Sequence, residues 1–239
     1  MSSAGILIIG NEILSGKVVD SNSPFLCREL RSLGVEVERI SVIPDVVETI
    51  ADEVRSMSRA YDYVFTSGGV GPTHDDLTMD GIALAFDVPI VRNEQLANRF
   101  RKVPNANESL MKMAMVPEGA RLLDAGDLTF PVVVVANVHI FPGIPSLLQR
   151  KFQSIRERFA GTPFELRRVY VKNHESDIAA SLHDVIAEFP DLMLGSYPRT
   201  GREAWGVLLT LESRDPDYVK RALDYLLKKL PPERVWKVE

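Results

Sequence analysis

Short apolar runs alternate with amphipathic stretches along the first third of the chain. Ile6 to Ile9 form a continuous apolar run that ends at a glycine, a pattern typical of a strand buried on both faces. Residues 23–34 then repeat leucine at helical spacing and end in a glycine, with Ser23 predicted as the helix N-cap. Further strands are expected at residues 35–43 and 63–66, each followed by a helix. The order βαβαβα predicts a mainly parallel sheet with helices on both faces, a three-layer α/β fold.

Particular residues mark where the following helices begin and break. Asp45, followed by Glu48, resembles the start of a capping box, although aspartate replaces the usual serine or threonine. A short helix is expected over residues 78–86, after the third strand. Residues 94–115 indicate a helix that is interrupted at Pro104-Asn105.

Two valine-rich runs follow, at residues 132–135 and 138–141. They are separated by two residues and predict two strands joined by a tight turn. The segment Phe141-Pro142-Gly143-Ile144-Pro145 ends the second strand and begins another helix.

Gly161-Thr162-Pro163 marks a candidate domain boundary, which divides the chain into residues 1–162 and 163–239. The second part is predicted to contain, in order, a strand at 166–171, a helix at 176–189, strands at 192–197 and 205–211, a helix at 216–230 and a strand at 234–238. This βαββαβ order is typical of a small α+β domain of the ferredoxin-like type.

Composition narrows the classes of function. The net charge is -5 and no block of lysine or arginine stands out, so the sequence gives little support to nucleic-acid binding. No segment approaches the length of about 18 apolar residues that a membrane span needs. Neither a signal peptide nor a disulfide is indicated, because the N-terminus has no basic region and Cys27 is the one cysteine. We expect a cytoplasmic protein.

Residues 67–78 carry the most informative sequence, Ser-Gly-Gly-Val-Gly-Pro-Thr-His-Asp-Asp-Leu-Thr, directly after the third predicted strand. Three glycines in four residues let the backbone turn sharply and come close to a ligand. The N–H groups of the loop, together with the N-terminus of the next helix, can form a cradle for a phosphate. The candidate phosphate-binding residues of the loop are Gly68, Gly69, Val70, Gly71, Pro72, Thr73 and Thr78.

Asp75 and Asp76 stand in the same loop, although a carboxylate repels a phosphate. A divalent cation between the carboxylate and phosphate oxygens removes this conflict, and Mg²⁺ commonly binds in this way. Such an ion can also polarise a phosphoryl group or activate water. The alternative is that one aspartate is a plain helix N-cap and that the glycines form a tight turn. The loop, the two acids and their position at a strand end together favour a ligand site.

Three polar residues outside the loop are further candidates. Asp45 follows the second predicted strand and Glu12 follows the first, and the carboxyl ends of parallel strands meet at one edge of a sheet. Asn22 precedes the first helix. Each has a simpler interpretation: Asp45 as a helix N-cap, Glu12 as a solvated loop acid, and Asn22, like Asp20, as a capping residue.

Several of these segments together resemble the molybdopterin-binding family of the MoaB/Mog type. They are Gly10-Asn11-Glu12-Ile13-Leu14-Ser15-Gly16, Asp20-Ser21-Asn22, Ile43-Pro44-Asp45, the loop of residues 68–78, Phe141-Pro142-Gly143-Ile144-Pro145 and Ser196-Tyr197-Pro198. Within this family the sequence is similar to the CinA N-terminal type, and more so to the N-terminal domain of eukaryotic-type FAD synthases. Three departures from the family pattern together favour the FAD-synthase-like branch: the usual Gly-Asp-Glu is changed at Asn11, the CinA-type Gly-Thr-Ala-Pro-Gly is absent between Leu123 and Val132, and Leu147 replaces a usual glutamate.

The resemblance implies the three-layer fold and often a homo-oligomer, a dimer or a trimer. It implies that Asp45 and Asp76 are functional acids beside a pterin phosphate. In CinA-like and FAD-synthase-like domains the same site is associated with metal-dependent cleavage of dinucleotide pyrophosphates such as FAD and ADP-ribose. Asp45, Asp75 and Asp76 would then hold Mg²⁺, Mn²⁺ or Co²⁺. A molybdopterin-binding protein without catalysis and an oligomeric scaffold are the alternatives.

Overall fold

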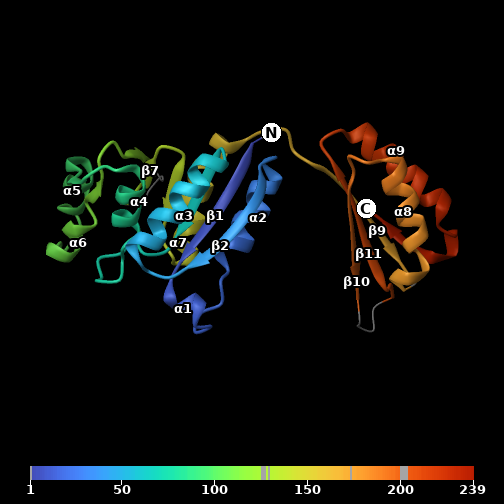
Figure 1. The fold of residues 1–239 in the computed structure, drawn as a ribbon, viewed down its shortest axis with the longest axis horizontal. Helices are drawn as coiled ribbons and strands as arrows, with labels where there is room; N and C mark the ends of the chain where they lie inside the picture. The colour runs from blue at the N-terminus through green and yellow to red at the C-terminus, as the bar shows by residue number, and fades with distance from the viewer. Residues whose placement is uncertain (1, 125–127, 129, 173, 200–203) are drawn as a thin grey trace. The chain divides into compact units, whose positions relative to one another are not determined.

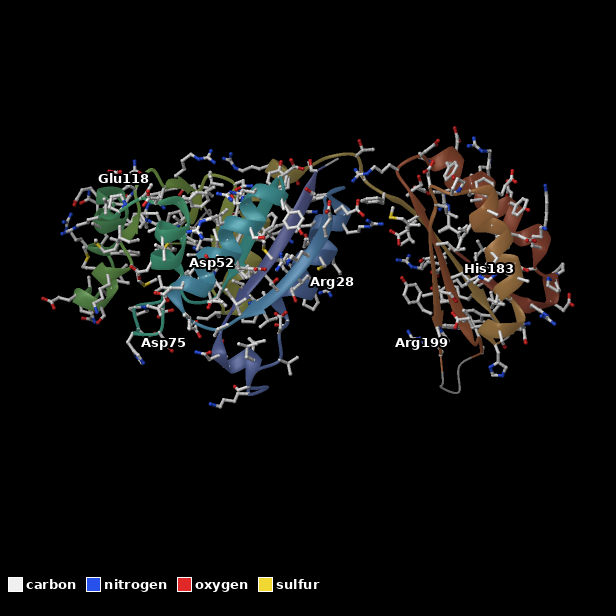
Figure 2. All side chains as sticks on the ribbon, in the orientation of Figure 1. Arg28, Asp52, Asp75, Glu118, His183 and Arg199 are labelled. Atoms are coloured by element: carbon white, nitrogen blue, oxygen red, sulfur yellow. The ribbon has the colours of Figure 1, made fainter. Side chains whose placement is uncertain are left out.

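The structure is a computed structural model that describes all residues except 1, 125–127, 129, 173 and 200–203. The chain forms two compact units, residues 1–161 and residues 162–239 (Figure 1). Each unit has its own sheet and its own hydrophobic core. Figure 2 adds the side chains and labels Asp75 in the first unit and His183 in the second.

The first unit contains a six-stranded sheet. Its strands lie in the order β2 (Glu36–Ile43), β1 (Ser3–Ile9), β3 (Tyr63–Ser67), β8 (Val138–Phe141), β7 (Val132–Val135) and β6 (Arg121–Leu123). The first four of these run parallel, and β7 and β6 are antiparallel to their neighbours. The mainly parallel sheet is therefore confirmed, and the valine-rich pair forms the expected antiparallel hairpin.

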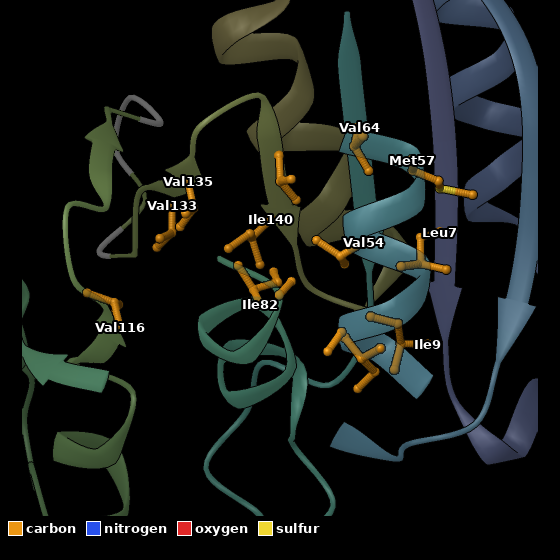
Figure 3. Packing of buried hydrophobic residues seen from close by; sticks show 14 of the residues in the cluster. Leu7, Ile9, Val54, Met57, Val64, Ile82, Val116, Val133, Val135 and Ile140 are labelled. Carbon is orange, nitrogen blue, oxygen red and sulfur yellow. The ribbon is translucent and has the colours of Figure 1, made fainter. Parts of the chain in front are cut away.

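Helices cover both faces of this sheet because its central strands are apolar on both sides. Ile6 and Ile8 of β1 pack with the layer of α2 (Asn22–Ser32) and α7 (Pro145–Ile155). Leu7 and Ile9 point the other way, toward the layer of α3 (Val47–Ala60) and α4 (Thr78–Phe86) (Figure 3). Alternate residues of one strand thus belong to two separate cores.

The start of α2 differs from the prediction. The helix begins at Asn22 with Ser21 as its N-cap, so the assignment of Ser23 as N-cap is wrong. The carboxylate of Asp20 accepts the backbone N–H groups of Asn22, at 2.9 Å, and of Ser23, at 3.1 Å. Asp20 therefore satisfies the first free N–H groups of the helix. A short helix that was not predicted, α1 (Asn11–Leu14), precedes this region.

Residues 90–117 contain more strand than the sequence indicated. The helical part divides into α5 (Glu94–Phe100) and α6 (Glu108–Lys112), and the predicted break between them is confirmed. On either side, β4 (Ile90–Arg92) and β5 (Met115–Pro117) pair antiparallel as a second small sheet. The prediction of helix up to residue 115 is wrong, because Met115 pairs with a strand distant in sequence.

The second unit is a four-stranded antiparallel sheet with helices. Its elements are β9 (Glu165–Val171), α8 (Ala179–Glu188), β10 (Met193–Pro198), β11 (Val207–Ser213), α9 (Pro216–Lys229) and β12 (Val235–Val238), in the predicted order. The strands lie in the order β10-β11-β9-β12. Short 3-10 turns are η1 (Arg156–Phe159) in the first unit and η2 (Glu175–Asp177) and η3 (Pro232–Arg234) in the second. Both long helices cover the same face of the sheet (Figure 1).

The helices of both units are short. Among the described residues the longest are α3 and α9, with 14 residues each. At a rise of about 1.5 Å per residue, such a helix falls short of the roughly 30 Å of a bilayer core. None of the helices in the described part of the chain has the length and apolar character to cross a membrane.

Two ionisable side chains lie inside the first unit. The His139 ring is stacked on Phe65, with 5.3 Å between ring centroids, and burial lowers the pKa of this histidine to about 4. Lys151 is 3% exposed and its ammonium group donates to the carbonyl groups of Phe130, at 2.6 Å, and Pro131, at 2.8 Å. Burial also lowers the pKa of this lysine, to about 7.

Candidate ligand-binding site

The segments that follow four parallel strands meet at the carboxyl edge of the sheet. The N–H of Gly10, after β1, donates to the carbonyl of Ile43 at the end of β2, at 3.1 Å. The N–H of Gly68, after β3, donates to the carbonyl of Phe141 at the end of β8, at 3.2 Å. The sheet therefore brings together the segments that carry the candidate residues.

The glycine loop has a shape that requires glycine at its first position. Gly68 has a φ of 107°, and a Cβ there would lie 2.0 Å from the carbonyl oxygen of Ile9. Gly69 follows with a φ of 61°. Thr78, the first residue of α4, fixes both glycines: its hydroxyl donates to the Gly68 carbonyl at 2.8 Å and its N–H to the Gly69 carbonyl at 3.0 Å. Thr78 thus holds the loop against the start of the helix.

Asp76 closes the loop from within. Its carboxylate accepts the N–H of Gly71 at 2.6 Å, the N–H of Thr73 at 2.8 Å and the hydroxyl of Thr73. These three donors leave the carboxylate with little remaining capacity to accept hydrogen bonds. In this structure the Gly71 N–H, predicted to face a phosphate, is directed to Asp76 instead.

Asp75 lies at the outer part of the same loop, and its side chain is 62% exposed (Figure 2). The pKa of Asp75 lies below its usual value, first because of the Thr73 hydroxyl and then because of a backbone hydrogen bond. The hydroxyl of Thr73 has one hydrogen, which in the structure is donated to Asp76, so the two aspartates compete for it. The neighbouring His74 is almost fully exposed.

Asp45 is not a helix cap. The N-cap of α3 is Val46, and no side chain caps this helix, so the capping-box interpretation is wrong. The carboxylate of Asp45 instead accepts the N–H of Asn11 at 2.8 Å. This hydrogen bond ties the end of β2 to the loop that follows β1. Asp45 therefore shapes the carboxyl edge of the sheet.

Asn22 is a buried link between three segments of this edge. It is 6% exposed, and its amide nitrogen donates to the Ser67 hydroxyl at 2.9 Å and to the Gly143 carbonyl at 2.7 Å. Its side-chain oxygen is buried and has no hydrogen-bond partner among the described residues. Asn22 and Glu12 both line a small cavity of about 60 Å³ beside Gly68. The capping interpretation of the Asn22 side chain is not supported by these contacts.

A larger cavity of about 360 Å³ is also bordered by the loop. Its wall includes most of the predicted loop residues and several that the sequence did not single out. The residues of the second kind are Met79, Asp80, Ile90, Lys112, Met113 and Met115. Met79 and Asp80 follow the loop directly in α4, whereas the others come from β4, the end of α6 and β5 and carry no local motif. The antiparallel pairing of β4 with β5 brings these later segments together.

The predicted metal ligands do not form a compact cluster. Within the described parts of the chain, no group of three or more His, Cys, Asp or Glu side chains is arranged to hold a metal ion. Asp76 lines the larger cavity, whereas Asp45 and Asp75 are not among the described residues that line either cavity. These donors fit Mg²⁺ or a similar ion only where ligand phosphate oxygens complete the coordination, since Mg²⁺ often takes just one or two carboxylates from protein.

Two protein-family models match the chain, one over each unit. The model of the probable molybdopterin binding domain matches residues 5–160. The chain belongs to this molybdopterin-binding family. The model of the FAD synthase middle domain matches the remainder, residues 163–239. The family match covers the sheet, the glycine loop and both cavities, and the second match covers the antiparallel unit.

Individual relatives of this family member confirm its resemblance to FAD synthases and CinA proteins. A protein of Archaeoglobus fulgidus is 36% identical over 220 residues, which cover 91% of this chain and 93% of that protein. The probable FAD synthase of Caenorhabditis elegans is 34% identical over 255 residues, which cover 93% of this chain and 49% of that protein. The chain thus spans about half the length of this synthase. The crystal structure of CinA from Thermoplasma acidophilum superimposes with a TM-score of 0.62 and 28% identity, covering 67% of this chain and 100% of that one.

Proposed function

We propose that the cavity beside the glycine loop binds the phosphate-bearing part of a pterin or a dinucleotide, and that the chain hydrolyses a dinucleotide pyrophosphate of the FAD or ADP-ribose type. The observation that carries the proposal is the cavity of about 360 Å³ walled by Gly69 to Thr73, Asp76 and Lys112. This volume lies in the range of small-molecule sites, and the cavity stands at the carboxyl end of a parallel strand, where such ligands bind.

The lining suits a ligand that combines a ring with a phosphate. Met79, Met113 and Met115 offer polarisable side chains that make favourable contacts with aromatic rings. The ammonium group of Lys112 supplies positive charge for a phosphate, in a cavity that Gly69 and Val70 also line. Pterin phosphates, flavin nucleotides and adenine nucleotides all have this combination. The names of the relatives, FAD synthase and molybdopterin binding domain, point to the same ligands.

Hydrolysis of a pyrophosphate requires water to attack one phosphorus atom. The bond from that phosphorus to the bridging oxygen breaks, the bridging oxygen leaves with the second phosphate, and two monophosphates form. A divalent ion would supply charge neutralisation and a more acidic water there. Asp76, which lines the cavity, keeps the loop in shape beside the phosphate, whereas Asp45 and Asp75 are not among the described residues of the cavity wall and are proposed only as further ligands of the ion.

A homo-oligomer, a dimer or a trimer, belongs to the same proposal. Apolar side chains are exposed in and after α1, next to the small cavity: Leu14 is 52% exposed, Val18 49% and Val19 86%. Apolar side chains gathered on a surface commonly mark a protein contact. Sedimentation of the chain, with Val19→Asp as the variant expected to dissociate the oligomer, tests this part.

The central experiment measures phosphate products from FAD, ADP-ribose and NAD in the presence of Mg²⁺, Mn²⁺ or Co²⁺. Asp76→Asn is expected to lower the rate more than 100-fold, because the amide loses charge and misaligns the loop. Asp87→Asn is a matched control: Asp87 is exposed, stands at the end of α4 with a φ of 54°, and asparagine tolerates that conformation. Equal rates for Asp76→Asn and the unmodified chain would exclude this role of Asp76.

The second candidate function is binding without turnover. It is favoured by Asn11, which stands where the resemblance to the molybdopterin-binding family implies an acid. A molybdopterin-binding protein of molybdenum cofactor metabolism would take up a pterin phosphate tightly and release no product. Saturable pterin binding together with no cleavage of any dinucleotide in the panel would support this function over hydrolysis.

A further inference from the structure

Among the described residues of the second unit, the helices cover one face of the antiparallel sheet and leave its other face without a helix. Val169 and Val171 of β9 and Leu209 of β11 point into the core beneath α8 and α9. Successive side chains of a strand alternate between the faces, so Arg168 and Tyr170 of β9 lie on the opposite, outer face. Figure 2 shows Arg199 on the strand side of this unit and His183 on the helix side.

Aromatic rings cross this outer face in a row. Tyr170 lies in the middle, with its ring centroid 5.1 Å from that of Trp205 and 5.8 Å from that of Trp236. Both tryptophan rings stand nearly perpendicular to the tyrosine ring, at 71° and 77°. Trp236 is 45% exposed. Tyr197, which is 53% exposed, lies over Gly195 on the same sheet, because a Cβ at Gly195 would come within 2.7 Å of its ring.

Positive charge accompanies the row of rings. The guanidinium of Arg199 lies over the Trp205 ring, 5.4 Å from its centroid, and the ammonium of Lys237 lies 6.0 Å from the centroid of Tyr170. Arg168 is exposed two residues before Tyr170 on the same strand. The hydrogen bond to Glu239 raises the pKa of Tyr170, and the hydrogen bonds from Lys237 and Tyr170 lower the pKa of Glu239, to which the charge of Arg168 adds a smaller lowering. Glu239 accepts hydrogen bonds from the Tyr170 hydroxyl, at 2.9 Å, and from Lys237. Three cations thus surround the rings beside a single carboxylate among these residues.

We propose that this outer face binds a free nucleotide, with its base stacked on one ring of the row of Tyr170, Trp205 and Trp236 and its phosphate near Lys237 and Arg168. Exposed rings on a sheet stack on planar bases, and nearby cations complement the phosphate. The net charge of -5 opposes a long polyanion, whereas a single phosphate needs only local cations. The occupant is therefore a small nucleotide and not a nucleic-acid strand. This site belongs to the second unit, whereas the glycine loop belongs to the first, and the proposal does not rest on the function proposed for that loop.

The composition of the chain supplies a reporter for this face. Both tryptophans of the sequence, Trp205 and Trp236, belong to the row. Intrinsic tryptophan emission of the full chain, excited at a wavelength that adenine does not absorb, therefore reports on this surface alone. Titration with AMP is expected to change the emission saturably, and ribose 5-phosphate, which has no base, is expected to leave it unchanged.

Variants separate stacking from charge. Tyr170→Ala is expected to weaken AMP binding at least tenfold and Lys237→Gln several-fold, whereas Tyr170→Phe keeps the ring and most of the affinity. Arg221→Gln is the matched control, because Arg221 also lies over a tyrosine, Tyr218, at 5.6 Å, but on α9. Asp76→Asn, in the other unit, is expected to leave the emission change intact.

Several outcomes would overturn the proposal. They are an unchanged emission up to millimolar AMP, equal affinity of Tyr170→Ala and the unmodified chain, or loss of the emission change in Asp76→Asn. Tighter binding of a single-stranded oligoadenylate than of AMP, per mole of strand, would assign the face to nucleic acid. An emission change on dilution of the protein alone, together with dissociation in sedimentation, would assign it to a second copy of the chain.

Discussion

The two units of the chain use their sheets differently. In the first unit, helices cover both faces, and neighbouring residues of β1 such as Ile8 and Ile9 enter different cores. In the second unit, helices cover one face, and Tyr170 and Trp236 lie on the other. A sheet covered by helices on both faces can present polar side chains to a ligand only at its strand ends. A sheet with one free face can present side chains from several neighbouring strands. The candidate sites follow this difference: one is built from loops and the other from strands.

The largest effect we expect comes from the core of the first unit. Phe65 is fully buried and its ring contacts Phe141, Phe152 and Phe159, so Phe65→Ala should lower the free energy of unfolding by about 3–5 kcal/mol. Both tryptophans belong to the second unit, so the midpoint of denaturation followed by tryptophan emission should not move, whereas the midpoint followed by circular dichroism should.

Leu209→Ala, in the core of the second unit, is the converse control. It should move the midpoint measured by tryptophan emission and leave the unfolding of the first unit in place. If either substitution shifts both midpoints equally, the two cores do not unfold separately. The two units would then not differ as independent units of stability.

Acid should weaken the first unit through His139. Its pKa is 6.5 when unperturbed and about 4 in the folded chain, so the unfolded state binds more protons between these values. The contribution of His139 to the free energy of unfolding is therefore fully present above about pH 6.5, and it falls by roughly 3 kcal/mol as the pH drops to about 4. Circular dichroism melts across this range should show a smaller slope in His139→Phe. The same change at the exposed His183 of the second unit should leave the slope unaltered.

The backbone of the glycine loop should be intolerant of a side chain. Gly68→Ala places a Cβ against the Ile9 carbonyl in an unfavourable conformation, and we expect a loss of about 2–3 kcal/mol in the free energy of unfolding. Gly119→Ala also has a positive φ, of 78°, but meets no atom within 4 Å, and should cost about 1 kcal/mol. Equal losses in urea denaturation would show that the contact with Ile9 is unimportant.

The smallest effect concerns the hydroxyl of Thr73. Thr73→Val removes one of the three donors to Asp76 and should destabilise the first unit by about 1 kcal/mol, while Thr73→Ser should be near neutral. Neither should alter the AMP-dependent tryptophan emission. A change in that emission would mean that the two candidate sites communicate, which would remove the distinction between them.

The sequence was sufficient for elements with strong local patterns. The helix of residues 78–86 and the element order of the second unit were predicted correctly because apolar spacing and turn residues lie within each segment. β4, β5 and β6 were missed, since each has three residues and depends on a partner elsewhere in the chain, as Ile90 does on Pro117. Strands this short carry no readable periodicity.

The site, like the fold, could be predicted only where its residues form a local pattern in the sequence. The glycine loop was recognised because its residues are consecutive. Lys112 and Met115, in the wall of the larger cavity, come from separate elements, so no sequence signal marks them. Asp45 was mistaken for a candidate cap because it precedes a helix, whereas its partner Asn11 is 34 positions away. The functional assignment of Asp45, Asp75 and Asp76 stays a prediction.

The closure of the loop by Asp76 has a consequence for how any anion would bind. The carboxylate already accepts hydrogen bonds from the N–H groups of Gly71 and Thr73. It thus occupies, with its own negative charge, the donors that an anionic ligand would use. A phosphate that takes these donors must exchange with Asp76, and the measured affinity is then a difference between two anions competing for one set of hydrogen bonds. Such an exchange favours ligands that bring a cation with them, because the displaced carboxylate then gains a new partner.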